Sequence, residues 1–422
     1  MSDNSQKGRS LGSNMLWNSV GSFFYFACQY LPTILVVRMA TGLNASGVFN
    51  YAMNTTNAFL TIAIYGMRAY QVSDLEGRYT DREYLSSRWL TSLVAAAACG
   101  CYGAVIRLDG ENWAALMLFM LFRIGEALVD VYSGIDQRAD RMDIIGKSFL
   151  ARGALSCAGF AAGMALCGDL LFSIGLMAAA SLGVALVYDR PWALRLSRVK
   201  QEDKVRMARI KALLVECAPL MVYSFLNTAI STIPRQFLQL QHGSVATAIF
   251  GSITAPTVVL QLGATYLFTP LISLFAHRWQ ERDKAGFGRL FGLVLAGIAA
   301  IGAAGFVGVR LLGRWGLTLL YSAGENGQQI LENEELLTPM VLCTVLTALV
   351  LFFNMLLTIL RDFRGLVLSN LIGIAACLAL SPLLVGRWEM WGASFALAGA
   401  LTVQAVCLLA FGLADAKRQF RD

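Results

Sequence analysis

One helical face within an apolar segment carries three charged side chains. Arg123, Glu126 and Asp130 occupy positions i, i+3 and i+7 of the segment 112–132, which places them on one side of an α-helix. Charge in an apolar segment is costly, so this face is expected to look into a helix bundle or a water-filled cavity. Two interpretations remain open. Arg123 and Glu126 form an internal ion pair that packs the helix, or Arg123 contacts substrate while Glu126 and Asp130 are ion-coupling candidates.

A second polar face consists of amides. Asn50, Asn54 and Asn57 follow the spacing i, i+4, i+7 in an earlier apolar segment, 46–67. Amides inside a membrane hold helices together by hydrogen bonds. They also offer donors and acceptors to the hydroxyl groups of a sugar. The sequence therefore predicts either a helix contact or the polar wall of a cavity.

Two arginines end apolar segments at equivalent places in the two halves of the chain. Arg38 follows a helix with Pro32, and Arg235 directly follows Pro234. A guanidinium group binds two oxygens of a phosphate at once, so the pair is a candidate for binding an anionic head group. The alternative is that both arginines extend to the membrane interface, as arginines at helix ends often do.

The sequence lacks the patterns of an enzyme or a metalloprotein. The nine cysteines fall almost wholly within apolar runs, without CxxC or Cys/His spacing, and the two histidines are predicted on opposite sides of the membrane. No GxxxxGK[ST] motif occurs, so the chain carries no ATPase of its own. We therefore predict no catalytic residue, no metal and no cofactor, with coupling to protons or sodium ions as the open question.

These side chains are positioned by apolar helices. The chain has 422 residues, of which 57% are hydrophobic and 14% charged, against about 25% charged in soluble proteins. Runs of about 20 apolar residues cross the hydrocarbon core as helices. We predict an all-α integral membrane protein with about twelve spans, at 14–37, 46–67, 89–106, 112–132, 148–167, 170–189, 213–234, 245–270, 287–309, 336–359, 366–385 and 391–413.

The distribution of basic residues predicts how the chain is oriented in the membrane and where its two lobes are divided. Of the 34 Lys and Arg residues, 27 lie on one side of the predicted spans and six on the other, with Arg123 inside a span. Arg152 and Arg289, just inside span ends, are counted with their adjoining loops, as is Arg88. This asymmetry predicts cytoplasmic termini, and it explains the net charge of +7 without nucleic acid. A basic cytoplasmic linker, 190–212, separates an N-terminal six-helix lobe, 1–189, from a C-terminal one, 213–422. Two such pseudo-symmetric lobes around a central cavity are typical of transporters.

Three stretches of the chain carry recognisable motifs: 37–74, with Val37-Arg38 and Gly47-Val48-Phe49-Asn50-Tyr51-Ala52; 134–143, with Gln137-Arg138; and 216–235, with Glu216-Cys217-Ala218-Pro219 and Ile233-Pro234-Arg235. These stretches resemble the bacterial polysaccharide flippases of the multidrug/oligosaccharidyl-lipid/polysaccharide exporter (MOP) superfamily. The chain departs from the family pattern after both arginines, with Met39-Ala40-Thr41-Gly42 and with Gln236. These departures leave the substrate subtype open.

The resemblance implies alternating access by two helix bundles in the bacterial inner membrane. The implied substrate is an undecaprenyl-pyrophosphate-linked oligosaccharide repeat unit of O-antigen, capsule or a related glycan. Expected partners are this lipid-linked oligosaccharide, the bilayer, and a polysaccharide polymerase with its chain-length machinery. A cation-coupled multidrug exporter of the same fold and a polytopic glycan polymerase or ligase are the alternatives.

Overall fold

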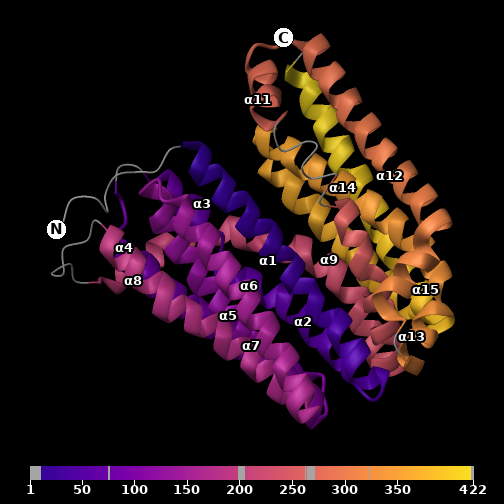
Figure 1. The fold of residues 1–422 in the computed structure, drawn as a ribbon. Coiled ribbons are helices and arrows are strands. Elements are labelled where there is room, and N and C mark those ends of the chain that lie inside the picture. The colour runs from indigo at the N-terminus through magenta and orange to yellow at the C-terminus, as the bar shows by residue number, and fades with distance from the viewer. Residues whose placement is uncertain are drawn as a thin grey trace. The chain divides into compact units, whose positions relative to one another are not determined.

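The predicted all-α fold is confirmed. A computed structural model describes residues 11–74, 77–197, 205–261, 263, 271–322 and 324–419, and these residues form helices joined by short turns, without a strand (Figure 1). The final part of the predicted span 245–270, with Pro270, lies outside the described residues.

The first half of the chain forms helices that match the first six predicted spans. Short helices α3 and α8 lie at segment ends, and a five-residue π-helix, η1, joins α7 to α8. The bounds are α1 Leu11–Met39, α2 Leu43–Ile64, α3 Met67–Ser73, α4 Asp81–Val105, α5 Gly110–Arg138, α6 Met142–Cys167, α7 Leu170–Val184, η1 Ala185–Asp189 and α8 Arg190–Leu196.

The second half contains two long helices, α9 and α15, that each extend over more than one predicted segment. Helix α9 continues through Pro219 and Pro234 and breaks at Gly243, where φ is 78°. Helix α15 changes direction at Trp388 and Glu389. The bounds are α9 Met207–Thr254, α11 Ile272–Gln280, α12 Lys284–Tyr321, α13 Gly324–Leu331, α14 Leu337–Leu360 and α15 Phe363–Gln419, with 3₁₀ turns at Ala255–Thr257 and Glu334–Leu336.

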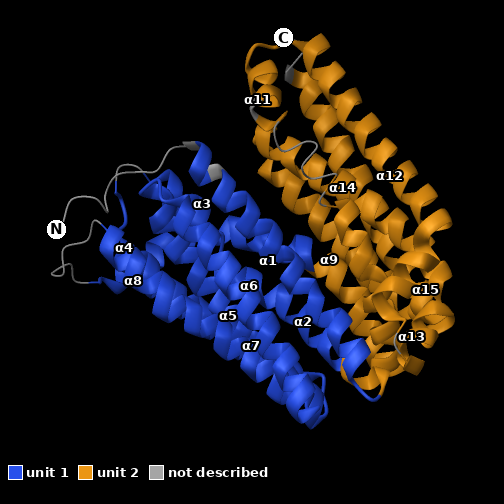
Figure 2. Cartoon of the chain, viewed as in Figure 1, with its two compact units in different colours: residues 1–41, 48–228 blue, residues 42–47, 229–422 orange. Residues whose placement is uncertain are grey.

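The contacts divide the chain into two compact units (Figure 2). Unit 1 contains residues 1–41 and 48–228, and unit 2 contains residues 42–47 and 229–422. The first turns of α9 therefore pack with unit 1, although they follow the linker in sequence. The lobe boundaries proposed from the sequence stay a prediction.

Seven described helices are long and apolar enough to cross a membrane; α15 contains two predicted spans, and α9 contains one together with the start of the next. Helices α2, α4 and α5 are not among the seven. Their sequences include asparagines and threonines in α2 and charged residues in α4 and α5, which lower the mean hydropathy. Much of this polar content is buried, including Asn50, Arg88 and Arg123. These helices therefore turn polar groups away from lipid.

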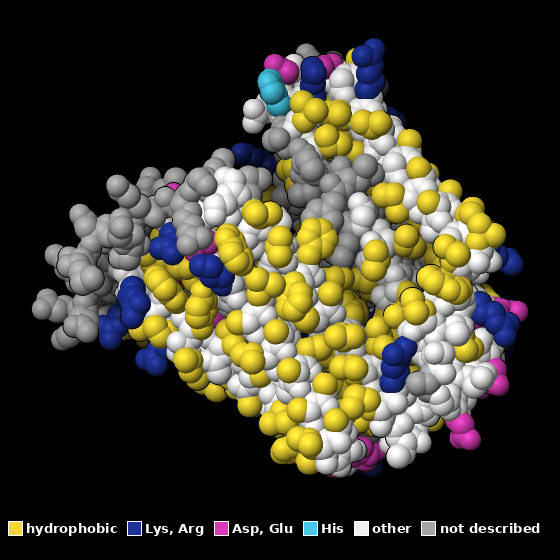
Figure 3. All heavy atoms as spheres, viewed as in Figure 1, with side chains coloured by type: hydrophobic (Ala, Val, Ile, Leu, Met, Phe, Trp, Pro, Cys, Tyr) yellow, Lys and Arg dark blue, Asp and Glu magenta, His cyan; other side chains and the backbone are white. Residues whose placement is uncertain are grey.

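On the face seen in Figure 3, hydrophobic side chains are spread over the middle of the helices, and most charged side chains lie near the helix ends. Leu93, Leu155, Val307, Leu311 and Leu383 are all more than half exposed. Soluble monomers rarely expose contiguous apolar patches of more than a few hundred Å². Such a surface is stable when it faces lipid, so the chain is a multi-pass membrane protein.

Small residues bring the helices of unit 1 into close contact. A Cβ atom added to Gly146 of α6 would overlap the backbone of Trp17 in α1, and one added to Gly163 would overlap Ser173 of α7. Close approach through glycine is a common packing mode of membrane helices. It fixes the register of α1 against α6 and thereby places the polar side chains of α1 opposite those of α5.

Candidate functional site

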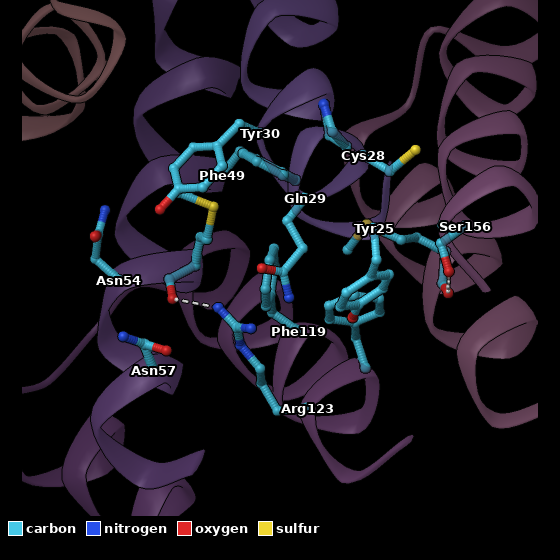
Figure 4. Close-up of a pocket in the computed structure, with 15 residues that line it drawn as sticks. Tyr25, Cys28, Gln29, Tyr30, Phe49, Asn54, Asn57, Phe119, Arg123 and Ser156 are labelled. Atoms are coloured by element: carbon cyan, nitrogen blue, oxygen red, sulfur yellow. Dashed lines mark hydrogen bonds between the residues drawn. The ribbon is translucent and has the colours of Figure 1, made fainter. Parts of the chain in front are cut away.

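Unit 1 contains a pocket lined by amides, aromatic rings and one arginine (Figure 4). It encloses about 640 Å³ of empty space, counting its open mouth. The lining comes from α1, α2, α5, α6 and α7. It includes Tyr25, Gln29, Tyr30, Phe49, Asn54, Asn57, Phe119, Arg123 and Ser156. Three of the six residues predicted to bind substrate, Asn54, Asn57 and Arg123, therefore lie together at one cavity.

Arg123 forms the ion pair expected from the sequence. Its Nη1 lies 2.5 Å from Oε2 of Glu126, and both residues are more than 90% buried. Its Nη2 also donates to the carbonyl oxygen of Met53 at 3.4 Å (Figure 4). The rings of Phe119 and Phe122 pack against the guanidinium at 5.3 and 5.8 Å. The charge at the pocket is therefore compensated and held in place from several sides.

The other Glu126 oxygen bonds to α1. Tyr25 donates its hydroxyl proton to Oε1, and Gln29 Nε2 donates to the same atom at 2.5 Å. Arg152 of α6 stacks on the Tyr25 ring, with 4.0 Å between the guanidinium carbon and the ring centre. Glu126 thus connects α1 with α5. A buried carboxylate with this many donors is stabilised in its ionised form, because each hydrogen bond replaces a lost contact with water.

The asparagine face divides into a buried and an accessible part. Asn50 is 1% exposed, whereas Asn57 is exposed at the pocket. Asn54 donates to the carbonyl oxygen of Asn50 at 2.7 Å, within its own helix. Asn54 and Asn57 line the pocket and offer amide groups to a ligand, while Asn50 packs inside the protein.

Asp130 belongs to a different cluster from Glu126. Its Oδ2 lies 2.7 Å from Nη2 of Arg88 on α4, and its Oδ1 lies 3.8 Å from Nη1 of Arg68 on α3. Arg88 is fully buried and also donates to the carbonyl oxygen of Ala63 at 2.7 Å. Of the two ion-coupling candidates, only Glu126 is bonded to residues that line the pocket, such as Arg123.

The two helix-end arginines lie in different units. Arg38 is exposed in the last turn of α1. Arg235 is half-buried in α9, with its guanidinium carbon 5.9 Å from the centre of the Phe250 ring in the same unit. Neither lines the unit 1 pocket.

Glu216, part of the third resembling stretch, connects the start of α9 to other residues of unit 1. Tyr70 and Tyr79 donate to its two oxygens, the latter at 3.1 Å, and Arg78 lies 2.6 Å away. The hydrogen bond to Glu216, with burial and the negative charge of the carboxylate, raises the pKa of the Tyr70 phenol to about 12. Tyr70 therefore keeps its proton and remains a donor at neutral pH.

Several polar residues of unit 1 were not identified as buried from the sequence. Arg88 and Arg152 were counted with the basic loops, yet they are 0% and 3% exposed. Asp136 and Asp189, near predicted helix ends, are also buried. Among the described residues, no group of three or more His, Cys, Asp or Glu could hold a metal ion.

Known structures share this fold over nearly the whole chain. An inward-facing multidrug resistance MATE family transporter of the MOP superfamily superposes with a TM-score of 0.73 at 12% identity, covering 96% of this chain and 99% of its own. The lipid II flippase MurJ in an inward closed conformation gives 0.71 at 12% identity, covering 96% and 90%. The chain is therefore a membrane protein with the MOP transporter fold, and the interpretation as a polytopic enzyme is not supported.

A relative in sequence has a name from capsular polysaccharide biosynthesis. The capsular polysaccharide biosynthesis protein CapF of Staphylococcus aureus is 22% identical over 316 residues, which are 74% of this chain and 78% of CapF. No protein-family profile matches the chain. The resemblance to polysaccharide flippases of the MOP superfamily is thus confirmed.

Proposed function

We propose that this protein flips undecaprenyl-pyrophosphate-linked oligosaccharide repeat units from the cytoplasmic to the outer leaflet by alternating access. The observation that carries the proposal is the unit 1 pocket, where Asn54, Asn57 and Gln29 present amides next to the paired Arg123. The similarity to a capsular polysaccharide biosynthesis protein agrees with a glycan as cargo.

The cargo explains why a membrane helix keeps these polar groups. Moving a glycan and a pyrophosphate through hydrocarbon without hydrogen-bond partners is prohibitive. Amide side chains replace water around sugar hydroxyls, because each amide both donates and accepts. The lipid tail remains in the bilayer, while Arg38 and Arg235 are the candidates to meet the pyrophosphate in the late part of the transfer.

Glu126 is the preferred candidate for coupling to protons or sodium ions. It is buried, and it bonds at once to Tyr25, Gln29 and Arg123. A cation bound at Glu126 would weaken its bond to Arg123 and so change the charge presented at the pocket. Asp130 is less suited, since Arg88 and Arg68 already compensate it.

In this proposal both termini lie in the cytoplasm of a bacterium. The proposed protein partners are a polysaccharide polymerase and its chain-length machinery. In a cysteine-free variant, a cysteine at Glu325, which is exposed, should react with an impermeant thiol reagent on intact cells. A cysteine at Ser197 should not react. Because Ser197 is half-buried and donates to Asp81 Oδ2 at 2.7 Å, a cysteine at the exposed Arg195 serves as its control. Labelling at Arg195 on intact cells would refute this orientation.

The function is tested by removing the gene from its own bacterium. Surface glycan should disappear while lipid-linked repeat units accumulate, and plasmid-borne wild-type protein should restore export. The measurements are surface polysaccharide by immunoblot and lipid-linked oligosaccharide by mass spectrometry. The alternative, a cation-coupled multidrug exporter, is favoured by the MATE-like fold. Unchanged surface glycan together with increased sensitivity to cationic drugs would establish that alternative instead.

A further inference from the structure

A buried carboxyl group at the end of α5 has no visible partner. Asp136 is 0% exposed, and neither of its carboxylate oxygens accepts a hydrogen bond in the structure. It lies past the predicted span 112–132, in the last turn of α5. Leaving a buried carboxylate unpaired costs several kcal/mol in general, so such groups usually neutralise by binding a proton.

A second carboxyl group lies close by on an unusual backbone element. Asp189 ends the π-helix η1, is 1% exposed, and accepts a hydrogen bond from Ser148 Oγ at 2.9 Å. The end of α5 packs on η1 and α8 through a common apolar cluster that includes Tyr132, Ile135 and Ala185. Single-turn π segments occur frequently at functional sites.

Most charged side chains around Asp136 and Asp189 form ion pairs or hydrogen bonds with other residues. Asp143 is fully buried and pairs with Arg141 at 2.8 Å and Lys147 at 3.4 Å. Arg138 pairs with Asp81, and Arg68 bonds to Asp130 and Gln137. The titratable and charged groups that interact electrostatically with Asp136 or Asp189 are Arg68 of α3, Tyr132 of α5, Arg141 before α6, Asp143 and Arg152 of α6 and Tyr188 of η1.

We infer that Asp136 is a proton-binding site, in which a negative charge on the neighbouring Asp189 increases the affinity for the proton. Two carboxyl groups in one dry site cannot readily both ionise, so one of them retains a proton. Asp136 takes it first, because the Ser148 hydroxyl donates a hydrogen bond to Asp189, whereas neither oxygen of Asp136 accepts one. The reaction is the uptake of one proton by one carboxylate, with no other group consumed.

Arg152 connects this site with the pocket. It is 3% exposed, its Nε and Nη1 make no hydrogen bond in the structure, and it acts electrostatically on both Asp189 and Glu126. When Asp136 loses its proton, the added negative charge attracts Arg152 toward the two carboxylates and weakens its electrostatic support of Glu126. This use of the proton in transport rests on the proposed function, whereas the binding site itself does not.

Infrared spectroscopy of the purified protein in nanodiscs tests the site without any transport assay. The wild type should show a protonated-carboxyl band at neutral pH that disappears at alkaline pH, and Asp136→Asn should lack this band. Asp189→Asn should keep the band but lose it at a pH lower by roughly one unit, because a repelling charge has been removed. Asp130→Asn, which alters a paired carboxylate, is the matched control and should leave the band unchanged.

Three outcomes would overturn the inference. One is a protonated-carboxyl band that persists in Asp136→Asn, and another is an unchanged titration in Asp189→Asn. The third is loss of the band when sodium replaces choline at constant pH, which would indicate a sodium site.

Protein abundance gives a second, independent readout. Asp136→Asn should accumulate in the membrane like the wild type, because asparagine resembles the neutral acid. Asp143→Asn should accumulate less, because it breaks the pairs with Arg141 and Lys147. A loss of abundance in Asp136→Asn as large as that in Asp143→Asn would mean that Asp136 is an ionised structural partner.

Discussion

Replacing Arg123 with methionine is expected to reduce the amount of protein in the membrane severalfold. The substitution leaves Glu126 buried without its cation, and breaking one side of a buried ion pair costs about 3–5 kcal/mol. A loss of even about 1–2 kcal/mol changes cellular abundance several-fold. Tyr25 and Gln29 still donate to Glu126, which places the expected cost toward the lower end of that range.

The double variant Arg123→Met/Glu126→Gln separates structure from function. It removes both charges, so abundance should recover, while glycan export should remain lost because the pocket no longer carries its cation. Arg310→Met, an exposed arginine on α12, is the control and should change neither quantity. Quantitative immunoblots and surface glycan are measured in the same cells. Normal abundance and normal export in Arg123→Met would exclude both roles for this arginine.

The ion pair could be predicted, but its partners on α1 could not. Spacing within one helix brings Arg123 and Glu126 together whatever the rest of the fold does. Tyr25 and Gln29 reach Glu126 only because α1 packs closely on α6 in one register, through the small residue Gly146. The sequence does not display such a register between helices far apart in the chain.

Counting basic residues indicates orientation but not burial. Arg88 and Arg152 were assigned to loops because each lies near the end of an apolar run. Arg88 instead meets Asp130 and the carbonyl oxygen of Ala63, and Arg152 stacks on Tyr25. An arginine near a span end can extend to the interface or turn inward, and the choice depends on a partner from another helix. The sequence does contain one indication of this burial. Asp130 is a carboxylate at a membrane depth similar to that of Arg88, on a different predicted span, and could therefore pair with it.

Several helices extend beyond the predicted spans, because polar residues outside the apolar segments are helical as well. Arg310 and Arg314 were predicted in an outside connection, yet α12 continues to Tyr321. Pro219 and Pro234 do not end α9, and the break comes at Gly243, which alone of these three has a positive φ. Hydropathy defines the part of a helix that fits the hydrocarbon, while hydrogen bonding and packing define how far the helix extends.

Substituting Arg38 or Arg235 with glutamine is expected to abolish export of surface glycan at unchanged protein level. A pyrophosphate is bound most tightly by planar groups that donate two hydrogen bonds at once, and glutamine removes both the charge and the fork. Lysine keeps the charge alone, so Arg38→Lys and Arg235→Lys should export part of the wild-type amount. Truncating a group that binds a charged partner typically costs about 2–5 kcal/mol in binding, enough to reduce transport at least tenfold.

Arg38 and Arg235 differ in burial, and this difference determines which measurement each variant needs. Arg38 is exposed, so its replacement should leave folding intact, whereas Arg235 is half-buried near Phe250 and its replacement needs the abundance measurement. Arg387→Gln alters an exposed arginine from the same predicted outer side and is the matched control. If Arg38→Gln and Arg235→Gln both export glycan at the wild-type rate, these arginines anchor the helix ends at the membrane interface. If only one is inactive at normal abundance, a single cation meets the head group and the two halves of the chain are not equivalent in binding it.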